Sequence, residues 1–400
     1  MKISNAMRVR VLTFSLTIAA MLGINVPNTF GQKAATAPSA EPDVLIFNDG
    51  EKLIGHLKHS TGASVVFESA MAGEITVDWN KIKELHTNQP FAVIGKDVKL
   101  QHGMNGSSVP QGNINVRDQK IEVIPPGQGQ AKALPVPSTA YVIDQATFRK
   151  NLLENPGFFQ GWAGGITAGA SLVQATQNSR SFTGAVALTR TVPGENWLDP
   201  RNRTLVNFSA SYGQVTQRNT PTIKTNIIHG DVERDEYLTS KLFAFGLASW
   251  DHNYSQGLDL QQLYGGGLGY TIFKTDIHQL NVKTGINYIR RAYFVPVDQL
   301  PPGEPVPPVT PTQNLIASSF GEDYTRKFNH GIVLTQSLTF LPAWNDLDAY
   351  SALGSLNLAL PLYKRFNLTL GVIDSYLNKP APPARGNSFQ FIAGLTYTLP

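Results

Sequence analysis

The sequence predicts an all-β protein: an antiparallel outer-membrane β-barrel of about twelve strands, preceded by a small β-rich module. Residues 162–399 alternate between apolar and small or polar side chains with a period of two, as strands with two different faces do. After the N-terminus, no apolar run approaches the roughly 18 residues that a transmembrane helix needs. Any membrane insertion must therefore use a closed barrel, in which every backbone polar group finds a partner.

Residues 1–31 have the layout of a secretory signal peptide. Basic residues open the segment, an apolar stretch covers residues 11–26, and small residues near Gly31 fit cleavage before Gln32. The alternative is a helical membrane anchor, but polar residues interrupt the apolar stretch, which is short for a span. We expect residues 32–42 to be a flexible leader.

Composition narrows the classes of protein. The chain has no Cys, which excludes a lipid-anchored Cys, disulfides and thiolate metal sites. The formal net charge is +4, and removing the three basic residues of the signal leaves +1. No cluster of Lys and Arg is present, so we expect no nucleic-acid partner. Charged residues are only 16% of the chain and Gly is frequent at 35 residues, which suits a barrel wall.

Residues 43–124 are predicted to form a compact β-rich module. The turn Asn48-Asp49-Gly50 has the positive-φ residues of a tight hairpin. The module is too polar for lipid and is expected in the periplasm, with a periplasmic or cell-wall partner. Its expected strands are 43–47, 52–58, 64–69, 74–79, 91–94, 114–116 and 121–124.

Residues 125–160 are expected to be a Pro- and Gly-rich linker with one short helix. Pro125-Pro126-Gly127 and Pro135-Val136-Pro137 favour extended chain. The helix is predicted over Asp144–Leu153, with its apolar residues on one side, and Asn155-Pro156-Gly157 would end it.

Residues 161–400 contain the predicted barrel. An even number of strands fits a barrel with both ends in the periplasm. In the last strand, Phe391 and Tyr397 should face lipid, and Gln390 and Thr396 should face the lumen. The expected strands are 161–173, 181–191, 203–213, 223–238, 240–250, 260–272, 277–292, 315–328, 331–341, 349–360, 364–376 and 388–399.

The connections alternate between short turns and longer loops, as in outer-membrane barrels. The Pro-rich segment Val295–Asn314 is an expected external loop. Val192–Asn202 breaks the rule, because it is long but falls on the periplasmic side. A soluble periplasmic β-protein would also alternate, but its inner face should carry large aliphatic residues. Here Thr183, Ala185 and Ala187 lie opposite the apolar face.

Strand 223–238 carries the densest charge. Period two places His229, Asp231, Glu233 and Asp235 on one face, which should be the lumen because charge facing lipid is costly. The row could attract cations, or hold a divalent metal through carboxylates and imidazole. Alternatively it is a solvated lumen wall paired with basic residues of other strands. With Lys283 and Arg291 as those partners, the candidate lumen-lining residues are His229, Asp231, Glu233, Asp235, Lys283 and Arg291.

Several motifs in residues 161–400 resemble one bacterial family. They are Gly161-Trp162-x-Gly, Gly257-Leu258-Asp259-Leu260, the run Gly265–Tyr270, Tyr288-x-Arg290-Arg291-x-Tyr293 and Gly394-Leu395-Thr396-Tyr397. In this order and spacing, they resemble the salt-induced outer membrane proteins, a family without an established activity. The resemblance implies an outer-membrane location in a Gram-negative bacterium.

No pattern points to catalysis. The sequence lacks a Ser elbow, a His-Glu-x-x-His motif and a phosphate-binding Gly loop, so we assign no catalytic residue, cofactor or metal ligand. We expect a non-enzymatic barrel, either a narrow solute or ion channel or an envelope-structural protein, with a link to osmotic or salt stress. An enzyme acting on lipids at the barrel wall is the alternative. Expected partners are outer-membrane lipids and the outer-membrane assembly machinery.

Overall fold

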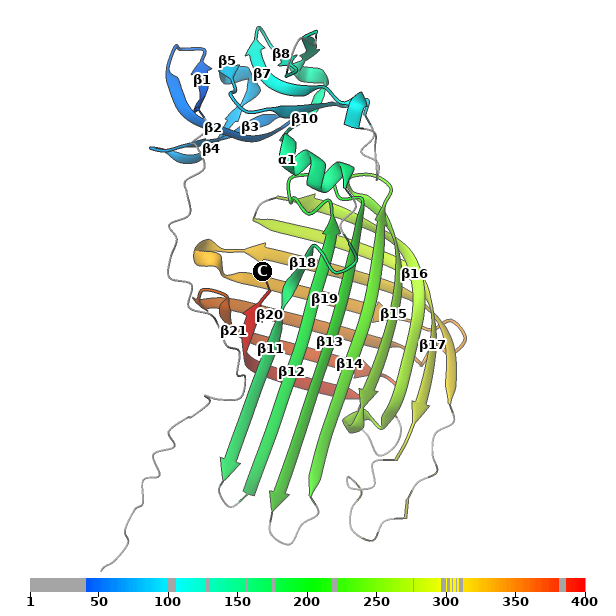
Figure 1. Ribbon diagram of the computed structural model, residues 1–400. Helices are drawn as coiled ribbons and strands as arrows, with labels where there is room; N and C mark the ends of the chain where they lie inside the picture. Colours follow the sequence, from blue (N-terminus) through cyan, green and yellow to red (C-terminus); the bar gives the residue numbers. More distant parts are fainter. Residues whose placement is uncertain are drawn as a thin grey trace, which may run out of the picture.

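The computed structural model contains two closed β structures, a small one followed by a large one (Figure 1). It describes residues 41–98, 106–126, 130–154, 157–174, 177–217, 222–275, 277–295, 300, 303, 305–306, 308, 312–380 and 386–399. The expected signal peptide, nearly all of the leader and most of the loop 295–314 lie outside these residues. Within them, no helix has both the length and the apolar character needed to cross a membrane.

The small structure is built from ten short strands. Its sheet follows the order β1-β5-β7-β6-β10-β2-β3-β4, and β1 also pairs with β2, so six of these strands close a small barrel. The strands are β1 Asp43–Phe47, β2 Lys52–Thr61, β3 Ser64–Ser69, β4 Gly73–Asp78, β5 Ile82–His86, β6 Phe91–Gly95, β7 Gln111–Arg117, β8 Lys120–Ile124, β9 Lys132–Pro135 and β10 Thr139–Asp144.

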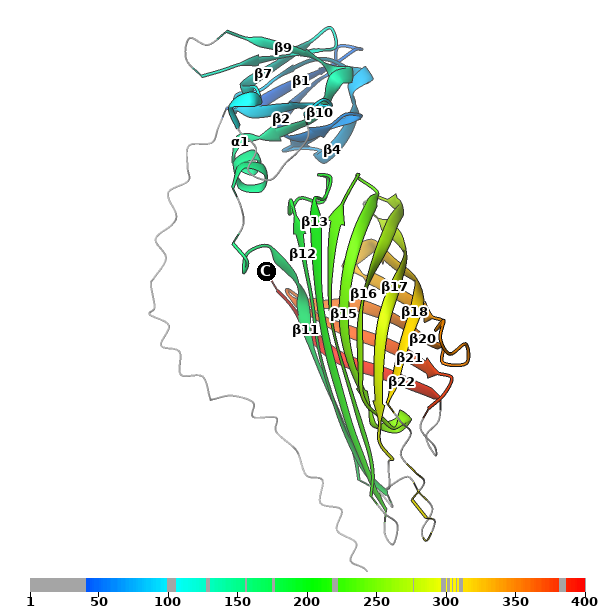
Figure 2. The same ribbon diagram turned by 90° about the vertical axis from the view of Figure 1, so that its right-hand side faces the viewer.

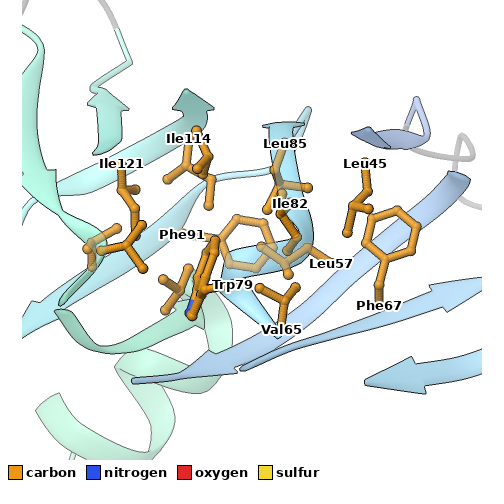
Figure 3. Close-up of a cluster of buried hydrophobic side chains, with 14 of the residues drawn as sticks. Leu45, Leu57, Val65, Phe67, Trp79, Ile82, Leu85, Phe91, Ile114 and Ile121 are labelled. Atoms are coloured by element: carbon orange, nitrogen blue, oxygen red, sulfur yellow. The ribbon is translucent and has the colours of Figure 1, made fainter. Parts of the chain in front are cut away.

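The core of the small barrel explains its closure. Large apolar side chains from β1 to β8 and Trp79 meet in one buried cluster (Figure 3). β10 pairs with β6 on one side and β2 on the other. The prediction that residues 125–160 are a linker is therefore wrong for its middle part. Residues Thr139–Asp144 form strand β10, which closes the small barrel around this core.

The predicted short helix is present. The helix α1 (Gln145–Phe148) begins after Asp144, whose carboxylate accepts a hydrogen bond from the Thr147 N–H and caps it. It continues as a π-helical turn over Arg149–Leu153. The buried Ile143, Phe148 and Leu152 share a second apolar cluster, on the side of the module that faces the large barrel (Figures 1 and 2).

The large structure is a closed antiparallel barrel of twelve strands, as predicted. Each strand pairs with its neighbours in the chain, and β22 returns to β11. The small module lies beyond the end where β11 begins and the C-terminus lies (Figure 2). The strands are β11 Trp162–Gln174, β12 Gln177–Val192, β13 Asn202–Gln217, β14 Ile223–Tyr237, β15 Leu242–Asn253, β16 Leu258–Lys274, β17 His278–Tyr293, β18 Gln313–Lys327, β19 Val333–Leu341, β20 Ser351–Tyr363, β21 Phe366–Leu377 and β22 Asn387–Thr398.

The outer surface of the large barrel is apolar all the way round. Every strand presents at least one large apolar side chain outward. These include Ile166, Phe182, Phe208, Val232, Trp250, Leu268, Ile286, Phe320, Leu338, Leu356, Tyr376 and Phe391, all exposed. A continuous apolar belt of this kind has no place in water and suits the hydrocarbon of a bilayer.

The inside of the barrel differs between its two sides. Small and polar residues of β11–β13, such as Thr167, Thr183 and Ser209, line one part of it. On β15–β18, however, large apolar side chains point inward and pack together, including Leu263, Ile289 and Leu315. The expectation of a uniformly small and polar inner face is therefore wrong on this side. Gly269 leaves room for another inward ring, because a Cβ there would lie 2.2 Å from the buried Phe243 ring.

Candidate functional site

The acidic row of β14 points into the barrel. Asp235 is fully buried and Glu233 nearly so, while Val232 on the opposite face is exposed. Register places Asp235 opposite Arg203 and Asp231 opposite Asn207 on β13. The charges of the other face, Arg234 and Glu236, bond to each other at the exposed end of the strand.

Lys283 joins two walls of the barrel. It lies on β17, and β15 and β16 separate this strand from β14. Its Nζ nevertheless donates to both carboxylate oxygens of Glu233, at 3.0 and 2.9 Å. The same Nζ lies 2.8 Å from Asp323 Oδ2 on β18, and Ser337 on β19 donates to Asp323. This chain of contacts links β14 with the neighbouring strands β17, β18 and β19.

A second ion pair lies beside the first. Arg203 Nε donates to Asp235 Oδ2 at 2.7 Å, and both side chains are largely buried. Phe243 and Phe245 of β15 stand next to these charges. The Arg203 guanidinium lies 5.7 Å from the Phe243 ring centroid, and Lys283 Nζ lies 5.8 Å from that of Phe245. Apolar rings thus exclude water from the pairs, which strengthens their attraction.

His229 lies between two carboxylates. Its Nδ1 is 2.6 Å from Asp251 Oδ1, and its Nε2 is 2.8 Å from Asp231 Oδ1. Ionised carboxylates only accept hydrogen bonds, so this geometry suits a ring that donates from both nitrogens. The second oxygens accept as well, from Asn207 for Asp231 and from Gln261 for Asp251.

Arg291 is not a partner of the acidic row. It is fully buried at the other end of the interior, where it donates to Gln261, Ser351 and the backbone carbonyl of Ala349. Ala349 and Ala343 belong to the connection between β19 and β20, and both are buried with the apolar cluster of β15–β18. This connection therefore packs into the interior of the barrel and narrows it.

The arrangement is a paired wall rather than a free acidic lining. His229, Asp231, Glu233 and Asp235 all have side-chain partners, and Lys283 bridges two carboxylates. No three or more His, Cys, Asp or Glu side chains of the described residues gather as a group that could hold a metal ion. The candidate residues fall into three groups: His229 and Asp231 with Asp251, Glu233 and Lys283 with Asp323, and Asp235 with Arg203. The exact partners across the interior, Asp323 and Arg203, were not predicted.

The long turn on the module side of the barrel is a second functional element. Residues 193–201, between β12 and β13, carry Trp197 and Leu198 to the small module. Leu198 is buried in the apolar cluster of Phe148 and Leu152, and Trp197 packs against it. The His59 ring of β2 stacks on Trp197 with centroids 4.0 Å apart. The length of this turn allows it to reach the module. In the sequence, the apolar pair Trp197-Leu198 within a long polar turn was the feature that could have indicated this contact.

Polar contacts complete this joint. Asn151 of the module makes three of these contacts. Its side-chain oxygen accepts from the Gly194 N–H, and its side-chain nitrogen donates to Glu195 at 3.5 Å. Its backbone carbonyl accepts from the Arg201 guanidinium. Burial, followed by the nearby Asp199 carboxylate, raises the pKa of the Tyr141 phenol. Burial also lowers the pKa of the Arg201 guanidinium.

Comparisons with known proteins find one family and several solved structures. Residues 166–399 match the family described as "Protein of unknown function, DUF481". No curated protein matches the chain. Similar solved structures include the translocator domain of the autotransporter NalP from Neisseria meningitidis (12% identity, 59% of this chain and 87% of that chain, TM-score 0.32). Others are the NanC porin (9%, 59% and 96%, 0.31) and the CymD monoaromatic hydrocarbon channel (8%, 77% and 86%, 0.28).

Proposed function

We propose that this chain, which belongs to the DUF481 family of proteins of unknown function, is a non-enzymatic outer-membrane protein. Its barrel provides a narrow path for small ions, which the Glu233–Lys283–Asp323 bridge closes. The small module sits at the periplasmic mouth, held by the turn 193–201. The observation that carries this proposal is the position of Lys283 between the carboxylates of Glu233 on β14 and Asp323 on β18.

The location rests on the outer surface. The apolar belt on all twelve strands supports insertion in a bilayer, and a module with a polar surface at one end suits the periplasm. Fractionation should find the protein in the outer membrane, with the heat-dependent gel migration of a stable barrel. Recovery as a soluble periplasmic protein would contradict the proposal.

The narrow path follows from what fills the interior. One side is packed by Leu263, Ile289 and Leu315, and the connection between β19 and β20 enters from outside. The Lys283 bridge adds charged side chains to this interior, between β14, β17 and β18. These side chains leave a narrow path, so we expect a small conductance rather than that of a wide porin.

Planar-bilayer recording of the purified full chain tests this path. The wild type should show a small conductance. Lys283→Gln removes the cation between Glu233 and Asp323, so conductance should rise and prefer cations more strongly, most of all at low salt. Lys58→Gln is the matched control, because Lys58 pairs with Glu68 on the exposed surface of the small module and should change neither property.

Other outcomes choose between the remaining roles. If neither the wild type nor Lys283→Gln conducts, the ion path is rejected and an envelope-structural role is the better explanation. Turnover of phospholipid by the purified protein would establish an enzyme instead. Higher expression in rising salt would support the link to osmotic stress. Outer-membrane lipids, the assembly machinery and a cell-wall contact of the module are its proposed partners.

A further inference from the structure

The seam that closes the large barrel is incomplete. β11 and β22 pair at only four positions, from Gly165–Thr398 to Ala168–Leu395. On its other edge, β11 pairs with β12 along its whole length, from Trp162 to Gln174. β22 likewise pairs with β21 from Asn387 to Tyr397. The two strands diverge toward the external end of the barrel (Figures 1 and 2).

The periplasmic half of the seam is held firmly. The Leu399 N–H donates to the Gly164 carbonyl at 2.9 Å. Inside the barrel, the Thr396 hydroxyl lies 2.7 Å from that of Thr167 across the seam and 2.6 Å from that of Thr369. These contacts make a fixed end from which the external half can open.

The external half leaves backbone groups without strand partners. Continuing the register would place Ala170 opposite Ala393 and Leu172 opposite Phe391, but the two described strands do not pair there. Unpaired N–H and C=O groups are costly in hydrocarbon, and open sheet edges do not persist in lipid. Something other than lipid tails must therefore satisfy these edges, or the seam must close.

The two sides of the opening differ in chemistry. Toward the membrane lie exposed apolar side chains, Leu172, Phe389 and Phe391. Behind the opening, a small hollow in the barrel is lined by hydroxyl and amide side chains together with small and apolar ones. Its residues include Thr183, Ser209, Ser211, Gln390 and Ile392, with no charged side chain.

We propose that the external half of the β11–β22 seam is a lateral gate between the membrane and the barrel interior, and that it admits amphiphiles with a neutral, hydrogen-bonding head. The head would bond to the free strand edges beside the hydroxyl-lined hollow, which has room for about one water molecule (about 10 Å³), while the tail stays beside Leu172 and Phe391. This gate does not depend on the proposed ion path, because it lies away from Lys283 and opens sideways.

Fluorescence quenching tests the gate. The chain has no Cys, so bimane can be attached to Ser211→Cys in the full chain, in phospholipid vesicles that contain a monoacylglycerol with a nitroxide on its uncharged glycerol head. Quenching at this site should greatly exceed quenching at Thr339→Cys, on β19. Equal quenching at the two sites would by itself overturn the proposal.

A disulfide across the seam supplies the second measurement. The variant carries Ser211→Cys, Ala170→Cys and Ala393→Cys. The disulfide between positions 170 and 393 is formed first and locks the seam, bimane is then attached at position 211, and dithiothreitol finally reduces the disulfide. Quenching should be low before reduction and high after it. The matched lock Ala168→Cys with Leu395→Cys, in the paired half, should leave quenching high throughout. Unchanged quenching on reduction, or a co-purifying polypeptide strand that fills the seam, would overturn the proposal.

Discussion

The imidazole of His59 lies face to face with the indole of Trp197, with ring centroids 4.0 Å apart and planes within 9°. His59 belongs to the small barrel and Trp197 to the turn between β12 and β13 of the large one. Tyr141 packs on the same indole from the side, 6.2 Å away. One aromatic side chain of the membrane barrel is thus seated in the module, which makes the joint between them specific.

Trp197→Ala should loosen the module from the barrel. The change removes the stack and much of the apolar contact with Leu198, which we expect to cost about 2 kcal/mol. Hydrogen exchange in the full chain should then speed up over residues 139–153. Trp344→Ala, on the external side, is the control and should leave this exchange unchanged. Unaltered exchange in Trp197→Ala would show that the stack does not hold the module.

Glu233→Gln and Lys283→Met should be strongly coupled. Each single change leaves a partner charge unpaired in a largely buried site, which typically costs about 3–5 kcal/mol. The double variant should lose less than the sum of the two losses. Stability is compared for the wild type, the two single variants and the double variant by the temperature at which the folded gel band converts to the unfolded one. Additive losses would mean that the contact across the interior is not formed.

The facing of the last strand predicts thiol reactivity. Phe391 and Tyr397 are exposed on the outer surface, whereas Gln390 lines the internal hollow and Thr396 bonds inside the barrel. Single Cys substitutions at the first two sites should react with a lipid-phase reagent, and those at the other two with an aqueous reagent. The reverse pattern would mean a register shifted by one residue, which exchanges the two faces.

Asp43 should make the small module less stable as the pH rises. Burial raises the pKa of this carboxyl above its ordinary value of 3.8, although the backbone N–H groups of Asn88 and Leu57 oppose the shift. A raised pKa means that the folded state holds the proton longer. Stability is therefore highest below pH 3.8 and declines as the pH rises through the raised pKa. Asp43→Asn should remove this slope in hydrogen exchange of the module.

Glu84 provides the control of opposite sign. A hydrogen bond with His86 lowers the pKa of Glu84 below its ordinary value of 4.5. Its contribution to stability is present above pH 4.5 and is lost as the pH falls through the lowered pKa. Glu84→Gln should therefore reduce the loss of stability in acid. The same slope in both variants would contradict the assignment to these two groups.

The sequence alone determined the local features of the barrel. Period two defined all twelve strands within a few residues, because lipid outside and a polar interior impose different residues on alternate positions. The same argument turned Glu233 and Asp235 inward, since charge facing lipid is costly. The apolar side of the short helix was also readable, because Phe148 and Leu152 lie one helical turn apart.

Only the tertiary structure decided which distant residues meet. Lys283 reaches Glu233 past β15 and β16, and no spacing along the chain encodes that distance. Trp197 became a docking residue because the module folds over the end of the barrel. The inward apolar packing of β15–β18 could not be predicted from the sequence. Period two separates the two faces of a strand, but it does not show which apolar residues of different strands meet inside the barrel. A period describes one strand, whereas contacts across a closed barrel depend on the curvature and stagger of all twelve.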